Sequence, residues 1–121
     1  MSKRILVVED QEDNRRILRD LLTSTGYEVI EAVTGDEGVT MAETQRPDLI
    51  LMDIQLPDLD GYEATRRIKA NSALRHIPIV AVTSYALSGD DVKAQEAGCD
   101  AYVTKPFSPR ALLAKIREYL P

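Results

Sequence analysis

The stretch Leu49-Ile50-Leu51-Met52-Asp53 consists of four consecutive apolar residues that end on a carboxylate. Other short, mainly apolar runs begin at Ile5, Val29, Ile79 and Ala101, and longer amphipathic stretches separate them. This alternation is typical of βα units, in which helices cover both faces of a parallel sheet. The pattern therefore predicts an α/β protein with five strands and five helices, in the order βαβαβαβαβα.

Glycines, caps and charges mark the ends of the predicted elements. Gly26 and Gly98 are suited to end the first and fourth helices in a left-handed conformation. The second apolar run is expected at an edge of the sheet, because Glu28 flanks it and Glu31 interrupts it. The first helix should bury a stripe made of Ile17, Leu18, Leu21 and Leu22. Residues suited to begin the later helices are Thr34 with Glu37, Gly61, Ser88, and Ser108 with Pro109.

Length and composition limit the class of protein. The chain has 121 residues, a net charge of −5 and 44% hydrophobic residues, which fits one domain with a real core rather than a disordered chain. The acidic balance argues against a general nucleic-acid binder, since phosphate backbones attract basic surfaces. No apolar run approaches the ~20 residues of a membrane span, and no signal peptide is evident. Cys99, the one cysteine, cannot form an internal disulfide, which fits a reducing compartment. Together these observations predict a soluble cytoplasmic protein without a membrane partner.

Ionisable and hydroxyl side chains follow four of the predicted strands. Glu9 and Asp10 follow the first, Asp53 the third, Thr83 the fourth and Lys105 the fifth. Ligands of open parallel sheets bind outside the carboxyl ends of the strands, so these side chains should converge there. Acids at short range are costly unless a cation lies among them. An oxygen-only ligand set favours Mg²⁺, with Mn²⁺ as the alternative.

The loop after the first strand excludes two common nucleotide-binding classes. It reads Glu9-Asp10-Gln11-Glu12-Asp13-Asn14 and contains no glycine. A dinucleotide-binding fold needs GxGxxG at this place and a nucleotide hydrolase needs GxxxxGK[ST]. Neither motif occurs in this loop.

The Lys105-Pro106 dipeptide follows the fifth predicted strand. A cis peptide bond between Lys105 and Pro106 would be one way to direct the lysine toward the acids.

Five motifs together resemble the receiver domain of bacterial response regulators over essentially the whole chain. They are Glu9-Asp10, Met52-Asp53-Ile54-Gln55-Leu56-Pro57, Asp60-Gly61, Val82-Thr83-Ser84 and Lys105-Pro106-Phe107. The resemblance implies one receiver domain over residues 1–121, a doubly wound parallel sheet and the flavodoxin-like strand order 2-1-3-4-5. It also implies residue roles: Asp53 as phosphoacceptor; Glu9, Asp10, Asp53 and the main-chain carbonyl of Gln55 as Mg²⁺ ligands; Thr83 and Lys105 as phosphoryl contacts; and Tyr102 as the aromatic switch residue.

The function implied by this resemblance is a phosphorylation-controlled signalling switch. Asp53 would receive a phosphoryl group from a sensor histidine kinase or a histidine phosphotransfer protein. The face of the fourth helix, fifth strand and fifth helix would then control a downstream protein partner. Such a protein is not a conventional enzyme, although it would promote its own phosphorylation and its own slow dephosphorylation, tuned at Gln55 and Tyr85. The chain ends after the last helix, so we expect a stand-alone regulator without an output domain, similar to regulators of division, polarity and development. The alternative to a stand-alone regulator is a domain excised from a longer protein. We expect a monomer, with a weak dimer as the alternative.

Two other classes of function remain open from the residues. An aspartate-nucleophile phosphatase of the haloacid-dehalogenase type needs a second acid two residues after the nucleophile, where this chain has Gln55. This residue counts against a phosphatase, and turnover of a phosphate ester in the presence of Mg²⁺ would support one. A scaffold that never accepts phosphate would differ from a signalling switch in not being labelled by acetyl phosphate. Several single residues have simpler interpretations: Tyr102 as packing, His76 as a solvated side chain, Cys99 as a small buried filler, and Arg15, Arg16 and Arg19 as a solvated basic face or a docking surface.

Overall fold

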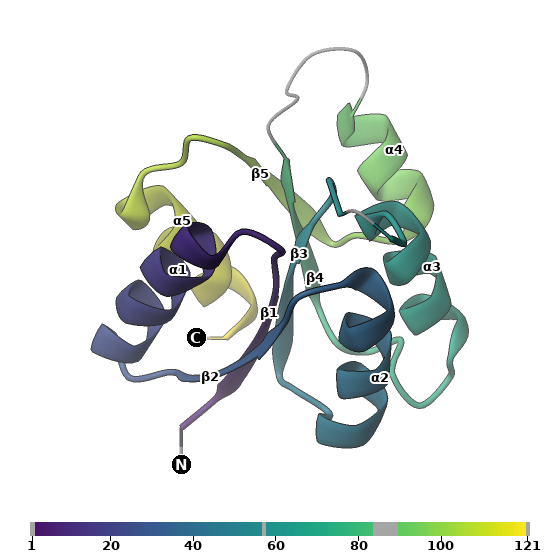
Figure 1. The fold of residues 1–121 in the computed structure, drawn as a ribbon, viewed down its shortest axis with the longest axis horizontal. Helices are drawn as coiled ribbons and strands as arrows, with labels where there is room; N and C mark the ends of the chain where they lie inside the picture. Colours follow the sequence, from purple (N-terminus) through teal and green to yellow (C-terminus); the bar gives the residue numbers. More distant parts are fainter. Residues whose placement is uncertain (1, 57, 84–89, 121) are drawn as a thin grey trace.

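The computed structural model describes residues 2–56, 58–83 and 90–120 (Figure 1). Within these ranges it contains strands β1 (Arg4–Val8), β2 (Glu28–Ala32), β3 (Leu49–Asp53), β4 (Ile79–Thr83) and β5 (Ala101–Thr104). The helices are α1 (Glu12–Ser24), α2 (Gly35–Gln45), α3 (Gly61–Ala70), α4 (Asp90–Ala97) and α5 (Pro109–Tyr119). The sequence predictions that concern Pro57, Ser84, Tyr85 and Ser88 lie outside the described residues.

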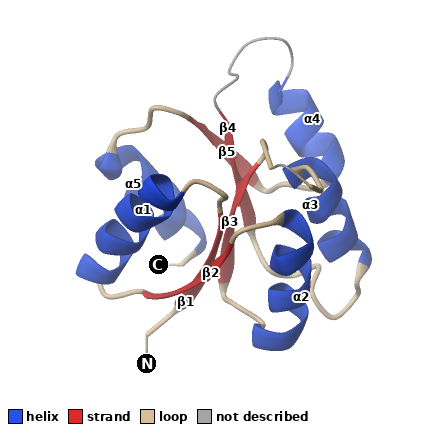
Figure 2. Ribbon diagram, in the orientation of Figure 1, coloured by secondary structure: helices blue, strands red, loops and turns tan. Residues whose placement is uncertain are grey.

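The five strands form one parallel sheet in the order β2-β1-β3-β4-β5, so the predicted fold and topology are confirmed. Helices α1 and α5 cover one face, and α2, α3 and α4 cover the other (Figure 2). Strand β2 lies at an edge, as its two acids predicted. The chain passes from β1 outward to β2 and then back across β1 to β3. This reversal places the carboxyl ends of β1 and β3 next to each other, at the position where such folds bind ligands.

Both faces of the sheet are apolar because successive strand residues point to opposite sides. On the first face, Ile5, Val7 and Leu51 pack with Leu22 of α1 and Leu112 of α5. On the second face, the core contains Leu6, Val8, Ile50, Met52, Ala64 and Ile68. Each large side chain that is fully buried contributes roughly 1.5–3 kcal/mol. This double core holds the strand ends, and with them the candidate site, in fixed positions.

The predicted caps are present at the helices whose ends are described. The Thr34 side chain accepts from the Glu37 amide, and the Glu37 carboxylate accepts from the Val33 amide, which closes the start of α2. Ser108 accepts from the Ala111 amide at the start of α5. Gly26 and Gly98 have φ of 95° and 103°, in the left-handed region that favours glycine.

One prediction about the first helix was wrong. Leu18 and Leu22 are buried and Leu21 is partly buried, but Ile17 is 56% exposed. At 3.6 residues per turn, Ile17 lies about 140° around the helix from Leu22, so it is at the margin of the stripe rather than at its centre. The exposed isoleucine instead lies at the rim of a cavity beside the candidate site.

Candidate functional site

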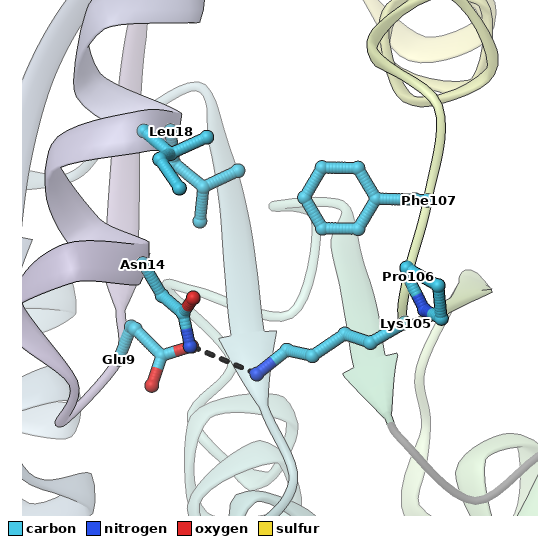
Figure 3. Close-up of a pocket in the computed structure, with 7 residues that line it drawn as sticks. Glu9, Asn14, Leu18, Lys105, Pro106 and Phe107 are labelled. Carbon is cyan, nitrogen blue, oxygen red and sulfur yellow. Dashed lines mark hydrogen bonds and ion pairs between the residues drawn. The ribbon is translucent and has the colours of Figure 1, made fainter.

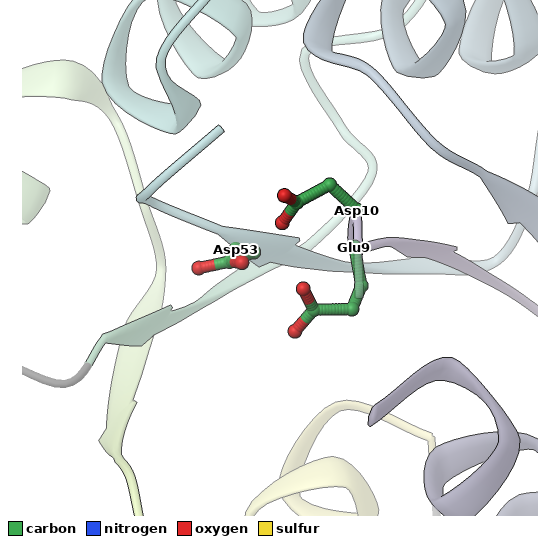
Figure 4. A group of neighbouring side chains, drawn as sticks. All are labelled: Glu9, Asp10 and Asp53. Atoms are coloured by element: carbon green, nitrogen blue, oxygen red, sulfur yellow. The ribbon is translucent and has the colours of Figure 1, made fainter. Parts of the chain in front are cut away.

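Three carboxylates meet at the carboxyl edge of the sheet. Glu9 and Asp10 follow β1, and Asp53 ends β3, which pairs with β1 through Val8 and Met52. One oxygen of each acid lies within 4.8 Å of the other two (Figure 4). Glu9 and Asp53 are buried, with side chains 2% and 4% exposed, whereas Asp10 is half-buried. The cluster is therefore open to solvent mainly on the side of Asp10.

Lys105 reaches into this cluster from the loop after β5. Its Nζ lies 2.9 Å from Oε1 of Glu9 and 3.6 Å from Oδ2 of Asp53. Figure 3 shows the extended side chain crossing toward Glu9. The Lys105 amide donates to the Thr83 carbonyl at 2.7 Å, and the peptide bond between Lys105 and Pro106 is cis. One ammonium thus faces two buried carboxylates.

Main-chain groups hold the carboxylates in place. The Gln55 amide donates to Oδ1 of Asp53, and the Gln11 amide donates to Oε2 of Glu9, both at 3.1 Å. Close packing fixes the end of β3 as well, because a Cβ at Gly61 would lie 2.3 Å from the Asp53 carbonyl oxygen. Glycine at the start of α3 therefore lets the helix approach the strand end that carries Asp53.

The two buried acids differ in their pKa. Burial raises the pKa of Asp53 to about 7, and the Glu9 carboxylate adds to this, while the Gln55 amide and Lys105 act against it. Burial also acts to raise the pKa of Glu9, but hydrogen bonds from Lys105 and from Asp53 outweigh it and leave this pKa lowered. Lys105 thus compensates Glu9 more fully than Asp53.

The donor set fits a hard divalent cation. Among the residues that the structure describes, Glu9, Asp10 and Asp53 form the acidic group close enough to share an ion. Carboxylate oxygens are the ligands that Mg²⁺ prefers, and few protein ligands leave it with bound waters. A cation here would offset the charge of Asp53 that Lys105 leaves uncompensated, which is the physical reason to expect one.

The raised pKa of Asp53 predicts a pH-dependent stability in the absence of divalent cations. Between its ordinary value of 3.8 and about 7, folded Asp53 binds a proton that the unfolded chain has released, so stability falls as pH rises. Asp53→Asn should remove this loss, so its free energy of unfolding relative to that of the wild type should rise by about 2 kcal/mol between about pH 5 and about pH 8. Urea unfolding of both proteins in EDTA, at these two pH values, measures this difference. A difference that is the same at both pH values would contradict the assignment, and Mg²⁺ should reduce the gain at the higher pH.

Thr83 and Tyr102 lie on the same face of two neighbouring strands. Tyr102 pairs in register with Ala81, which is two residues before Thr83 in β4. Thr83 is buried and Tyr102 is half-buried. Tyr102 packs near Ala81 and Ala94 of α4, and it lines a cavity of about 220 Å³ between α4 and β5. Thr83, at the end of β4, and the Tyr102 ring near α4 therefore lie on the same face of the sheet.

A larger cavity of about 490 Å³ adjoins the carboxylates on the other side. Its lining residues come from α1 and from the loops after β1 and β5: Glu9, Asn14, Ile17, Leu18, Lys105, Pro106 and Phe107 (Figure 3). Glu9 and Lys105 form its polar part, and Leu18 and Phe107 lie in its apolar part. The site therefore continues into an apolar depression along α1.

The solvated basic face that the sequence favoured for α1 is wrong for Arg15, whose side chain is only 16% exposed, whereas that of Arg19 is 42% exposed. Arg15 and Arg19 both pair with Glu31 of β2, at 3.5 Å and 2.9 Å. Arg16 remains on the surface and pairs with Asp13 at 3.3 Å. The spacing of Arg15 and Arg19 by four residues indicated a shared helix face, but nothing in the sequence placed Glu31 beside it.

Two other contacts near the site were missed by the sequence analysis. Asp58 accepts from the amides of Gly35 at 3.0 Å and Asp36 at 3.3 Å, so the loop after β3 is joined to the start of α2. Arg15 donates to main-chain carbonyls of the acidic loop. Of the simpler interpretations, His76 is exposed as expected, and Cys99 is only half-buried, with Sγ 3.8 Å from Oγ1 of Thr65.

Comparisons with known proteins agree with this geometry. A family model described as response regulator receiver domain matches residues 5–117. The polar-differentiation response regulator DivK of Brucella anthropi is 45% identical over 120 residues, which cover 99% of this chain and 98% of the relative. DivK of Brucella ovis is 44% identical with the same coverage.

Solved structures show the same likeness. The receiver domain of a sensor histidine kinase from Pseudomonas aeruginosa, with magnesium coordinated in its active-site cleft, has a TM-score of 0.93 and 41% identity over 99% of this chain and 98% of that one. The chemotaxis protein CheY4 of Vibrio cholerae has a TM-score of 0.92 and 26% identity over 98% of this chain and 99% of that one.

None of the described helices is long and apolar enough to cross a membrane.

Proposed function

Because the chain belongs to the response regulator receiver family, whose members are phosphorylation-controlled signalling switches rather than conventional enzymes, we propose that Asp53 is the phosphoacceptor of this protein. The observation that carries the proposal is the position of Asp53. It is a buried carboxylate at the end of β3, with two acids and one ammonium around it and a pKa raised to about 7. The donor is a phosphohistidine of a sensor histidine kinase or a histidine phosphotransfer protein.

Glu9, Asp10, Asp53 and the main-chain carbonyl of Gln55 would hold Mg²⁺, with Mn²⁺ as the alternative. The magnesium bound to the Pseudomonas aeruginosa receiver domain supports this choice. When bound, the ion supplies positive charge to offset the negative charge of the transferred phosphoryl oxygens. It also favours the ionised form of Asp53, which is the form that can attack.

The transfer itself needs positioning and charge compensation more than covalent chemistry from the protein. An oxygen of Asp53 attacks phosphorus in line, the phosphorus–nitrogen bond of the donor breaks, and the histidine leaves with its electron pair. Lys105 lies 3.6 Å from the attacking carboxylate, so its ammonium can follow the charge onto the phosphoryl oxygens. Thr83 offers a hydroxyl to the same group. Water later removes the phosphoryl group slowly, at a rate tuned at Gln55, which is exposed beside the site.

The depression along α1 supports a macromolecular donor. It begins at Glu9 and Lys105 and continues to Leu18 and Phe107, with the exposed Ile17 at its rim. A donor surface that places its phosphohistidine over Asp53 would cover these apolar groups. A small phosphodonor such as acetyl phosphate would reach the acids without using them.

The output proceeds through Thr83 and Tyr102 to the face made by α4, β5 and α5. When Thr83 turns toward the phosphoryl group, Tyr102 rotates inward, and this face presents a different outline to a downstream protein. The two arrangements form a two-state equilibrium, so the phosphoryl group needs to favour one of them by only about 3–5 kcal/mol. The likeness to DivK supports a pathway of polar differentiation as the process controlled.

Thr83→Ala tests the output separately from the chemistry. The variant should still accept phosphate on Asp53, within about fivefold of the wild-type rate, but Tyr102 should no longer respond to activation. Chemical shifts of the Tyr102 ring, with and without beryllium fluoride and Mg²⁺, measure the response. Thr65→Ala removes another buried threonine hydroxyl, in α3, and serves as the control. An unchanged Tyr102 environment in the activated wild type would disprove this route while leaving the phosphoacceptor in place.

The proposed function itself is tested by incubating the protein with acetyl phosphate and Mg²⁺ and recording its intact mass. The expected result is the addition of one phosphoryl group, and EDTA should prevent it. A scaffold would stay unlabelled. A phosphatase of the haloacid-dehalogenase type would instead turn over a phosphate ester such as para-nitrophenyl phosphate in the presence of Mg²⁺.

A further inference from the structure

Arg15 connects three parts of the molecule that meet beside the carboxylates. It lies in the first turns of α1, and its side chain is only 16% exposed. Nη1 donates to the main-chain carbonyl of Glu9 at 2.9 Å and to that of Asp10 at 3.1 Å. Nε lies 3.5 Å from Oε1 of Glu31 in β2. One guanidinium thus bridges two successive carbonyls of the acidic loop and is itself anchored on the edge strand.

These two carbonyls belong to the residues whose side chains form the acidic cluster. When a carbonyl is held by a donor, its peptide plane is fixed, and the direction of the neighbouring side chains follows from it. The Glu9 amide is held as well, since it donates to the Ala32 carbonyl at 3.0 Å. Among the contacts of the described residues, Arg15 is the donor to both of these carbonyls, so it holds the main chain of the acidic loop on the side away from the Ala32 contact.

We propose that Arg15 is a positioning residue for the divalent-cation site, because it fixes the main chain of Glu9 and Asp10 so that their carboxylates point at the ion. This inference rests on the proposed function, which assigns these carboxylates as cation ligands. Mutation of groups that orient metal ligands from behind typically lowers metal affinity by roughly 10–100-fold. In the contacts described, Arg15 does not touch the carboxylate oxygens of Glu9, Asp10 or Asp53.

The ion pairs with Glu31 alone do not account for this arrangement. Arg19 makes the shorter contacts, at 2.9 and 3.1 Å to the two Glu31 oxygens, yet it makes no described contact with the acidic loop. Arg15 lies farther from Glu31, at 3.5 Å, and it is the arginine that contacts the main-chain carbonyls of Glu9 and Asp10. A lysine could not replace it fully, because a single ammonium lacks the planar fork that contacts carbonyls and carboxylate together.

The test is a Mg²⁺ titration of the unphosphorylated protein, followed by the chemical shifts of loop amides such as Gln11. Arg15→Ala should weaken Mg²⁺ binding about tenfold, and Arg15→Lys about threefold. Arg19→Ala is the matched control: it also removes one partner of Glu31, and it should bind Mg²⁺ within about twofold of the wild type. Acetyl phosphate labelling of all four proteins at subsaturating Mg²⁺ should follow the same order.

Equal Mg²⁺ affinity in Arg15→Ala and the wild type would overturn the inference. An equal loss in Arg15→Ala and Arg19→Ala would also overturn it, because the effect would then run through Glu31 rather than through the loop carbonyls. If Arg15→Ala is unfolded by circular dichroism, Arg15→Lys decides, and wild-type affinity in that variant counts against the inference. Failure of the wild type to bind Mg²⁺ or to accept phosphate would instead refute the proposed function.

Discussion

Asp53→Asn is expected to abolish phosphorylation of this protein by acetyl phosphate in the presence of Mg²⁺. The amide is a poor nucleophile and cannot form the acyl phosphate, and the substitution also removes one carboxylate from the proposed cation site. The variant should remain folded, since it removes a carboxylate whose burial, together with the neighbouring Glu9 carboxylate, raises the pKa of Asp53 to about 7. Intact mass after incubation measures the loss, and circular dichroism verifies the fold.

The matched control is Asp20→Asn, which makes the same chemical change at an exposed position of α1. This control should gain one phosphoryl group at the wild-type rate. A phosphoryl adduct on Asp53→Asn that is stable at neutral pH would show that another residue is the acceptor. The assignment of Asp53 would then be wrong, although the fold and the family would be unaffected.

Asp10→Ala should lower the rate of phosphorylation by about 100-fold or more at Mg²⁺ concentrations that saturate the wild type. Asp10 is the half-buried member of the cluster, on its solvent side, so it is the ligand through which an ion would enter. Its removal leaves Glu9, which Lys105 already engages, and Asp53, which in the proposed function is also the attacking group. The rate of labelling by acetyl phosphate as a function of Mg²⁺ concentration measures the effect.

Asp13→Ala provides the comparison for Asp10→Ala. It removes an equal charge three residues further along, from an exposed side chain that pairs with Arg16. This variant should keep the wild-type dependence on Mg²⁺. If Asp10→Ala were phosphorylated at the wild-type rate, the cation site would have to be formed by other groups.

The order of strands and helices was predictable from the sequence because it depends on local signals. Apolar runs such as 49–53 specify buried strands, and Thr34 with Glu37 specifies a helix start through contacts four residues apart or fewer. The position of Asp53 at the carboxyl end of its run placed it at the ligand-binding edge. The strand order itself followed from the resemblance to a family rather than from spacing.

The tertiary structure alone decided the features that depend on contacts between distant segments. Ile17 is exposed although its helical spacing places it near buried leucines, because burial depends on which part of the helix surface the rest of the chain covers. Arg15 and Arg19 meet Glu31 only because β2 lies beside β1 in the sheet.

The same division holds within the site. The sequence by itself determined which acids and which lysine gather at one edge, since parallel strands bring their carboxyl ends together. It did not determine that Lys105 lies closer to Glu9 than to Asp53, or that burial raises the pKa of Asp53 to about 7. Desolvation and ion-pair distances depend on what the whole chain packs around a group, and that is decided only when segments nearly a hundred residues apart, such as Glu9 and Lys105, come into contact.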